Sequence, residues 1–205
     1  MDVILTTGGV DVQECEVLAL GFFEDERPLK GATGWTDWRL NGKLSRFCID
    51  GKLTGAWGET TLIPSEGRMS PRMMLLLGLG RVREYGILRV RELSSSLWRV
   101  LQKMRAPSAC VSLPCGEGTP VNCGKLLAVF LEEGAHCADE KPQGFEEGWI
   151  KNLQLLFAEE QGGSSEILIG IQTAKSILEK RFPFRILIPS GKKTSASMST
   201  GSFTE

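Results

Sequence analysis

Residues 72–79 read RMMLLLGL, and this stretch decides the fold class. It is a continuous apolar run of about one strand's length, the pattern typical of a strand that is covered on both faces. After Gly80 the pattern changes, because apolar residues between Ile87 and Met104 recur at steps of three and four, as on one face of a helix. The sequence therefore predicts a buried strand, a glycine turn and a long amphipathic helix that ends before Pro107.

Segments of both kinds alternate on either side of this unit. Apolar or β-branched segments predict further strands at residues 3–7, 16–23, 60–63, 109–113, 152–158 and 185–188. Helical patterns occur in part of residues 28–48, from the Thr119-Pro120 pair to Gly134, and from Ser164 or Ser165 to Leu178. Such alternation predicts the α/β class, with a mixed, largely parallel sheet flanked by helices.

Length and composition indicate one domain with a tail. The chain has 205 residues, of which 41% are hydrophobic and 24% are charged, as in ordinary globular proteins. We expect residues 1–188 to form a single α/β domain. Residues 189–205 consist mostly of Ser, Thr, Gly and Lys. Such a segment cannot offset its ordering entropy, so we expect it to be a disordered tail.

The overall charge and hydropathy exclude several classes of protein. A formal net charge of −1 gives no general attraction to nucleic acid or to an anionic membrane. No apolar run approaches the roughly 20 residues of a membrane span. The first residues also lack the basic segment that opens a signal peptide. We therefore predict a cytoplasmic protein that has no membrane contact.

The six cysteines could belong to a metal site or a catalytic site, and the sequence favours neither kind of site. The spacings between Cys110, Cys115, Cys123, His136 and Cys137 do not match the paired pattern of structural zinc sites. Without an export signal, we expect reduced and mostly buried thiols. Cys115 and His136 could form a nucleophile–base pair, but the sequence shows no orienting acid. We instead expect His136 to cap a helix that ends at Gly134.

Three stretches, taken together, resemble a known family. The first is LALGFFED at residues 18–25, and the second combines GKLSRF at residues 42–47 with LTGAWGET at residues 53–60. The third is LLLGLGR at residues 75–81, followed by the long helix. Their order and spacing are similar to those in the N-terminal, non-catalytic domain of leucine aminopeptidases, also called cytosol aminopeptidases. The resemblance is strongest over about residues 15–105.

This resemblance implies a fold and separate roles for an N-terminal and a C-terminal domain. In the family, the N-terminal domain has a macro-domain-like, three-layer α/β architecture and contributes to a hexameric assembly. A separate C-terminal domain carries two metal ions and the peptidase site. The family's metal-binding stretches, Lys-Gly…Asp-Thr-Gly-Gly and Asn-Thr-Asp-Ala-Glu-Gly-Arg, do not occur here, and no Asp lies between Asp50 and Asp139. We therefore expect no catalytic residues, no metal ligands and no cofactor.

One stretch could bind a ligand. Gly78 and Gly80 could let main-chain N–H groups approach a phosphate, with Arg81 adding positive charge. Macro-type domains bind nucleotide diphosphates in comparable loops. The dinucleotide fingerprint is incomplete, because Arg83 stands at its third glycine, and a plain strand-to-helix turn is the alternative. The second glycine-rich stretch, residues 116–119, carries Glu117, which makes it a poorer anion site.

Two surfaces could serve association. Residues 81–105 contain seven basic and two acidic side chains, and some bacterial members of the family bind DNA. Nucleic acid is therefore possible as a partner, but a solvated helix face paired with acids elsewhere is favoured. Trp35 and Trp38, three residues apart, are the best candidates for a protein-association surface.

The sequence thus predicts a non-catalytic assembly or interaction module that forms a homo-oligomer or binds a protein partner. Two alternatives remain open. The first is a macro-domain-like binder of a nucleotide or ADP-ribose-type ligand, with Gly78, Gly80 and Arg81 at its site. The second is an accessory component of a metallo-aminopeptidase.

Overall fold

The structure is a computed structural model that describes the chain except for residues 7, 141–146, 159–163, 179–184 and 188–205. The tail predicted at residues 189–205 lies outside the described residues. The strands are β1 (Asp2–Thr6), β2 (Val17–Phe22), β3 (Thr60–Pro64), β4 (Met73–Gly78), β5 (Ser108–Ser112), β6 (Gln154–Ala158) and β7 (Arg185–Leu187). The α-helices are α1 (Gly31–Arg39), α2 (Lys43–Ile49), α3 (Ile87–Met104), α4 (Cys123–Glu140), α5 (Glu147–Asn152) and α6 (Ser164–Leu178).

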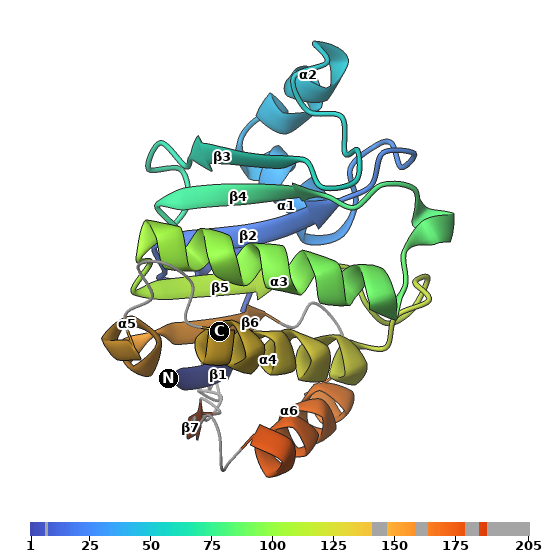
Figure 1. The fold of residues 1–205 in the computed structure, drawn as a ribbon. Helices are drawn as coiled ribbons and strands as arrows, with labels where there is room; N and C mark the ends of the chain where they lie inside the picture. Colours follow the sequence, from blue (N-terminus) through green and yellow to red (C-terminus); the bar gives the residue numbers. More distant parts are fainter. Residues whose placement is uncertain (7, 141–146, 159–163, 179–184, 188–205) are drawn as a thin grey trace, which may run out of the picture.

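The strands form one sheet in the order β3-β4-β2-β5-β6-β1-β7 (Figure 1). Among the described strands, only β3 is antiparallel to its neighbour, and the other pairings are parallel. The predicted core strand, β4, pairs with β2 on one side and with β3 on the other. This arrangement confirms the predicted mixed, largely parallel sheet.

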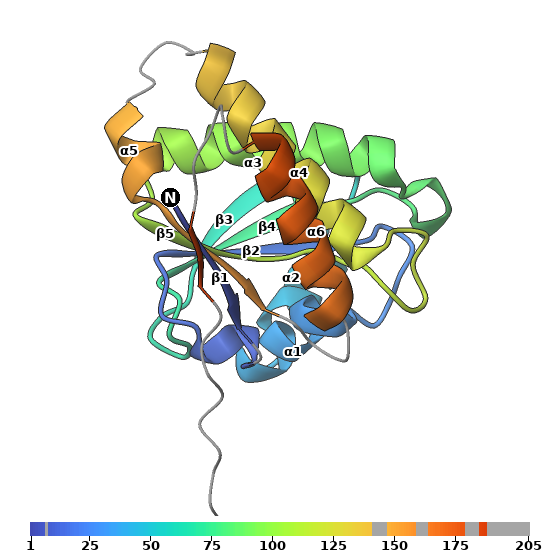
Figure 2. The ribbon, with the colours of Figure 1, turned by 90° about the horizontal axis from the view of Figure 1, so that it is seen from below.

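Helices cover both faces of this sheet (Figure 2). Alternate residues of the central strands point into two separate cores. Val17, Ala19 and Leu75 join the core under α3, α4 and α6, whereas Leu18 and Leu20 join the core under α1 and α2. Both faces of β2 and β4 are therefore buried, which explains their continuous apolar sequences. The three-layer α/β prediction is confirmed.

The long helix predicted after Gly80 is α3. Its apolar stripe, which includes Val90, Leu93 and Leu97, is buried against the sheet and α4. Arg105, with φ of 49°, ends the helix in the left-handed conformation. The prediction that this helix ends before Pro107 is therefore confirmed.

The helix predicted between Pro120 and Gly134 has different ends. Asn122 caps α4, because its Oδ1 accepts a hydrogen bond from the Lys125 N–H at 3.0 Å. Gly134 does not stop the helix, which continues to Glu140. A Cβ at Gly134 would lie 2.4 Å from the Trp98 ring, so this glycine allows close packing of α4 on α3. His136 lies within α4 and is exposed, so its predicted capping role is wrong.

No helix among the described residues is long and apolar enough to cross a membrane.

The sequence pattern did not predict α5, a short helix directly before β6. It also placed one interrupted helical region at residues 28–48, where the structure has α1 and α2. Gly42, with φ of 73°, separates these two helices.

Candidate functional site

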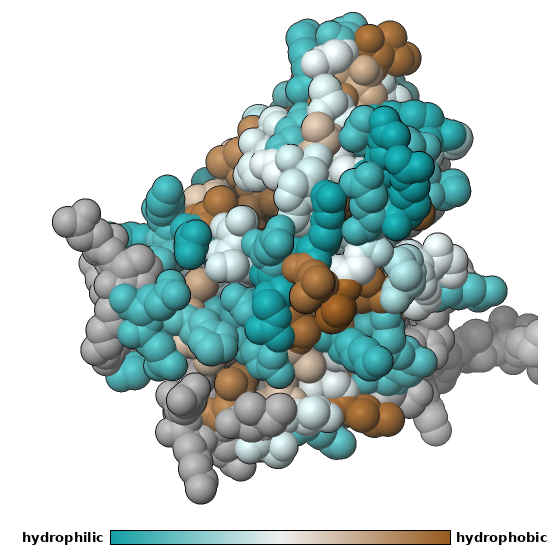
Figure 3. Space-filling view, turned by 45° about the vertical axis from the view of Figure 1, so that its right-hand side comes forward, coloured by the Kyte–Doolittle hydropathy of each residue, from teal (hydrophilic) through white to brown (hydrophobic). Residues whose placement is uncertain are grey.

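A pocket of about 440 Å³ lies at the edge of the sheet where the parallel strands end. The last residues of β2, β5 and β6 contribute to its lining, together with the segments that follow β2 and β5. Figure 3 shows this side of the molecule, with apolar side chains near the middle of a mostly hydrophilic surface. In open α/β sheets, ligands characteristically bind beyond the carboxyl ends of the strands. The pocket therefore occupies the position where this class of fold usually binds a ligand.

One wall of the pocket is the segment from the end of β2 to the first turn of α1. The Thr33 hydroxyl donates to the Gly21 carbonyl at 2.8 Å, which fixes the start of α1 against β2. Within the described residues, the N–H groups of residues 31–33 donate to no protein acceptor, since Gly34 makes the first helical hydrogen bond. These residues line the pocket, so the positive end of α1 borders it.

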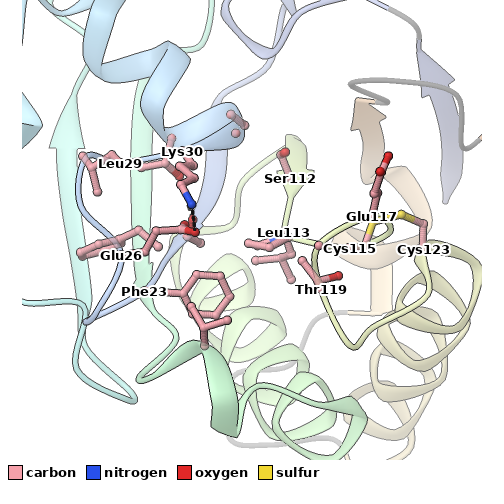
Figure 4. A pocket seen from close by; sticks show the side chains of 18 of the residues that line it. Phe23, Glu26, Leu29, Lys30, Ser112, Leu113, Cys115, Glu117, Thr119 and Cys123 are labelled. Atoms are coloured by element: carbon pink, nitrogen blue, oxygen red, sulfur yellow. Dashed lines mark hydrogen bonds and ion pairs between the residues drawn. A yellow bond between two sulfur atoms is a disulfide. The ribbon is translucent and has the colours of Figure 1, made fainter.

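The opposite wall is the loop after β5, and it contains a disulfide between Cys115 and Cys123 (Figure 4). The two Cα atoms lie 4.9 Å apart, because Gly116 and Gly118 both adopt positive φ and fold the loop back on itself. Thr119 completes the reversal by donating its N–H and its hydroxyl to the Gly116 carbonyl, each at 3.0 Å.

The expectation of reduced thiols is therefore wrong for this pair. Spacing alone did not reveal it, because the reversal depends on the conformation of the glycines. Cys15, Cys110 and Cys137 are buried free thiols, as predicted. Cys48, the remaining free thiol, is half-buried.

The charges around the pocket are mixed. Glu26 and Lys30 form an ion pair of 2.9 Å on one side, and Glu117 projects from the loop on the other (Figure 4). Phe23 and Leu113 supply apolar surface between them. Because two carboxylates face one ammonium, the side chains offer little net attraction to an anion, and the start of α1 is the part of the lining that favours negative charge. The arrangement suits a ligand with an apolar or aromatic body and an anionic end near the start of α1.

The glycines predicted to bind a ligand have a different environment. The N–H groups of Gly78, Leu79 and Gly80 donate to the carbonyls of Glu59, Phe22 and Gly55, at 2.8, 3.0 and 2.8 Å. A phosphate would therefore have to compete with existing main-chain hydrogen bonds.

Close packing explains why Gly78 is a glycine. A Cβ at this position would lie 2.1 Å from the Ala56 carbonyl oxygen. Arg81 is half-exposed, with its Nε 3.9 Å from a Glu24 carboxylate oxygen. Val82, the next residue, lines the pocket, whereas Gly78, Gly80 and Arg81 do not. Their role in ligand binding stays a prediction.

Trp35 and Trp38 lie on the surface of α1. They are 49% and 65% exposed, and their rings stack with centroids 4.9 Å apart. The Trp35 indole N–H donates to Asp11 at 3.2 Å, and Arg39 pairs with the same carboxylate at 3.0 Å. Beside the rings lies a shallow hollow lined by residues 29–31 and Gly34, and residues 29–31 also line the strand-end pocket.

Several charges of the basic segment are paired with acids. Arg91 contacts Glu132 and Glu133 on α4, at 3.2 and 2.7 Å. Arg89 contacts Glu84 at 2.9 Å and lies over the Trp57 ring at 4.5 Å. These pairs reduce the positive field that a phosphate backbone would meet, which favours the predicted solvated helix face.

Among the described residues, no three His, Cys, Asp or Glu side chains gather as ligands for a metal ion. The donor set in this part of the chain therefore does not fit the two-metal site that the resemblance assigns to another domain of the family. We derive no catalytic step through such ions.

Sequence comparison points to one family. Residues 19–134 match the N-terminal domain of the cytosol aminopeptidase family. A probable cytosol aminopeptidase of Cyanothece sp. is 26% identical over 136 residues, which cover 66% of this chain and 28% of that protein. The chain thus spans only about a quarter to a third of the length of such relatives.

Solved structures share the fold. A mutant of tomato leucine aminopeptidase aligns with a TM-score of 0.59 and 15% identity, over 87% of this chain and 37% of that one. A Trypanosoma brucei macrodomain in complex with ADP aligns with a TM-score of 0.59 and 12% identity, over 83% of this chain and 69% of that one. Both likenesses concern the fold, and they confirm its macro-domain-like architecture.

Proposed function

Because this chain belongs to the cytosol aminopeptidase family, through the N-terminal domain of that family, we propose that it is a non-catalytic module that associates with further copies of itself. One observation carries the proposal: two tryptophans stack on each other at the surface of α1. The hexameric assembly that the resemblance implies supports it. The peptidase activity of longer relatives is not proposed for the residues described here.

The exposure of the pair is unusual for its residue type. Trp98, by contrast, is 1% exposed and donates its indole N–H to the Phe130 carbonyl at 2.8 Å. Large aromatic side chains left at a surface are the residues that most often anchor protein interfaces, where each can contribute about 2 kcal/mol or more. Trp35 and Trp38 fit this role.

The geometry of the pair is also fixed in advance. Asp11 holds the Trp35 indole, and Arg39 holds Asp11. A Cβ at Gly34 would lie 2.3 Å from the Leu29 carbonyl oxygen, so glycine keeps this turn of α1 close to the segment before it. A surface whose side chains are already ordered loses little conformational entropy on binding.

Size-exclusion chromatography with light scattering tests self-association. We expect the chain to elute as an oligomer over a micromolar concentration series, and the Trp35→Ala/Trp38→Ala double variant to elute as a monomer. Ile49→Ser is the matched control, because Ile49 is 83% exposed on α2 and makes no part of the pair. Circular dichroism would verify that each variant folds. A wild-type monomer at every concentration, or an oligomer that survives the double substitution, would refute the proposal.

A second proposal concerns the strand-end pocket, which we infer binds a nucleotide-type ligand. The N–H groups of residues 31–33, which have no acceptor in the part of the chain that the structure describes, and the apolar wall at Phe23 and Leu113 support it. The fold is also similar to that of a macrodomain in complex with ADP. Adenosine diphosphate is therefore the first probe, with its phosphates directed at the start of α1.

Thermal unfolding in the presence of ADP tests this second proposal. Ligand at a hundredfold excess over its dissociation constant adds about 2.7 kcal/mol to the free energy of unfolding. Ser112→Phe, which fills the pocket at the end of β5, should abolish the shift, and Arg81→Ala should preserve it. If Arg81→Ala abolished the shift and Ser112→Phe preserved it, the ADP site would lie at Gly78, Gly80 and Arg81 instead. No shift in the wild type would end the proposal.

A role as accessory to a metallo-aminopeptidase is the third possibility. The described residues offer no clustered metal ligands, so we expect no hydrolysis of amino-acid amides by this chain with manganese or zinc. An assay with and without a catalytic relative separates the two roles. Turnover by the chain alone would contradict the non-catalytic proposal, and stimulation of the relative would establish an accessory role.

A further inference from the structure

The six cysteines divide into two chemical groups. Burial raises the pKa of Cys15 to about 11 and raises the pKa of Cys110, Cys137 and Cys48 as well. A thiol whose pKa is raised stays protonated at neutral pH and is therefore a poor nucleophile. Cys115 and Cys123 are instead half-buried, bonded to each other, and part of the pocket wall (Figure 4).

We propose that Cys115 and Cys123 form a reversible thiol–disulfide site, through which low-molecular-weight thiols loosen and restore the pocket wall at residues 116–119. Disulfides that form in a reducing compartment, such as the predicted cytoplasm, are usually transient and redox-sensing. The proposal does not rest on the function proposed above, because it concerns the bond and the loop and requires no ligand.

The anchors of the loop do not depend on the disulfide. Ser112 is held in the sheet by its pairing with Leu20. The start of α4 is held against α6, where a Cβ at Gly170 would lie 2.2 Å from the Gly124 carbonyl oxygen. Asn122 also donates to Glu166 on α6, at 2.7 Å. Cleavage of the disulfide therefore leaves both ends in place.

Between these anchors, Val121 is buried in the core, and the backbone hydrogen bonds found among the described residues are local to the loop. Gly116 donates its N–H to the Val121 carbonyl at 2.8 Å, and Thr119 contacts the carbonyls of the same two residues. Glu117 and Gly118, at the tip, are exposed. Reduction would remove the one covalent restraint on the 115–123 loop, so the tip would gain conformational freedom and the pocket would lose a fixed wall.

The position of Cys123 assigns an order of attack. It is the first residue of α4, an 18-residue helix, and a helix N-terminus stabilises a thiolate. An external thiolate therefore attacks the Cys115 sulfur, and the S–S electron pair leaves with Cys123. A second external thiolate attacks the outer sulfur of the mixed disulfide and releases the Cys115 thiolate. The net change converts two small thiols into one small disulfide, and two electrons reduce the protein bond.

Alkylation and mass spectrometry of the full chain, equilibrated in glutathione buffers of graded ratio, test reversibility. We expect Cys115 and Cys123 to change together from disulfide to thiols, and to return when the ratio is reversed. Cys15, Cys110 and Cys137 should remain thiols throughout, as internal controls. A pair that stays reduced at every ratio, or that cannot be reduced without unfolding, would overturn the proposal.

Hydrogen exchange tests the effect on the pocket wall. Peptides that cover residues 113–122 should exchange at least severalfold faster in the reduced chain, whereas peptides from α3 should not change. A Cys115→Ser/Cys123→Ser double variant should show the fast exchange under oxidising conditions too. Equal exchange of the loop in both redox states would refute the proposal that the disulfide controls the order of the pocket wall.

Single variants test the order of attack. With oxidised glutathione near neutral pH, Cys115→Ser, which retains Cys123, should form a mixed disulfide about threefold faster than Cys123→Ser. Cys123 should react faster because the helix N-terminus favours its thiolate, and the larger thiolate fraction outweighs the smaller intrinsic nucleophilicity. Glu117 and Glu166 are nearby acids that keep the advantage modest. Cys48→Ser is the control and should not alter the disulfide, and equal or reversed rates would refute the assigned order.

Discussion

Two glycine-rich segments lie at the same edge of the sheet and do different things. In the turn at residues 78–80, three consecutive N–H groups donate to protein carbonyls, and Gly78 is a glycine because a carbonyl oxygen occupies the space of its Cβ. In the loop at residues 116–119, the glycines have positive φ, and Gly118 would place a Cβ in open space. The first segment is closed by its own structure, whereas the second forms the wall of a pocket.

The comparison shows what a glycine pattern cannot tell. Gly78 serves close approach, whereas Gly80, Gly116 and Gly118 supply positive φ, and the two uses look alike in a sequence. The destination of each N–H group decides whether a glycine turn can receive an anion. By that criterion the first turn of α1, whose N–H groups at residues 31–33 have no acceptor among the described residues, is better placed than the turn at residues 78–80.

The largest expected effect comes from alanine in the closed turn. Gly78→Ala would force a methyl group to 2.1 Å from the Ala56 carbonyl oxygen, and that oxygen belongs to the main chain. We expect the free energy of unfolding to fall by about 3 kcal/mol, as in strongly overpacked sites. Urea unfolding measures it. A loss below about 1 kcal/mol would mean that the turn is not closed as described.

Removal of the disulfide tests the second segment, the loop at residues 116–119. Chain entropy assigns about 2.5 kcal/mol to closure of a loop this short, given a sequence separation of 8. We expect Cys115→Ser/Cys123→Ser to lower the free energy of unfolding by that amount. Wild-type protein unfolded with a reductant present should match the variant. If reductant destabilised the variant as well, other bonds would be responsible.

Alanine in the open loop should have a smaller effect than alanine in the closed turn. Gly118 has φ of 81°, and no atom of the described residues lies within 4 Å of a Cβ placed there. Gly118→Ala therefore adds backbone strain without a clash, and we expect a loss of about 1.5 kcal/mol. The same urea experiment compares it with Gly78→Ala. Equal losses in the two variants would erase the distinction between closed and open segments.

The smallest effect should be a gain, at Tyr85, five residues after the closed turn. Within the described residues, the buried hydroxyl of Tyr85 has no hydrogen-bond partner. Tyr85→Phe removes an unsatisfied polar group, so we expect a gain of about 1 kcal/mol in the free energy of unfolding at neutral pH. A loss of stability would show that the hydroxyl is satisfied.

The alkaline behaviour of Tyr85 gives a second readout. Burial raises the pKa of this phenol above its ordinary value of 10. As the pH rises above about 10, the unfolded chain releases the proton while the folded chain retains it, so stability falls as the pH rises. The fall should be smaller in Tyr85→Phe, as measured by urea unfolding between pH 9 and 11.

Much of the fold could be predicted from local pattern. The run at residues 72–79 indicated a strand buried on both faces, and the periodicity after Ile87 indicated α3, because each pattern depends on residues close in sequence. The end of α4 could not be predicted, since Gly134 resembles a stop signal until Trp98, from another helix, is placed against it.

The candidate site was harder to predict than the fold. Trp35 and Trp38 were found because two tryptophans three residues apart share a helix face. The pocket combines the ends of three strands with two connecting segments, so no single stretch encodes it. Cys115 and Cys123 are 8 apart, a spacing without a signature, and they meet because Gly116 and Gly118 turn the chain. Glu117 argued against an anion loop in the sequence, yet the same loop forms a pocket wall.

The place of β1 in the sheet governs the order in which the chain can fold. Its neighbours among the described strands are β6 and β7, at residues 154–158 and 185–187, so β1 pairs with two strands that are synthesised much later. Pairings this distant in sequence are slow to form, and unpaired strand edges invite aggregation during synthesis. Until residues 154–158 have emerged, β1 has neither of these neighbours, and a chaperone that holds the nascent chain would be most useful in that interval.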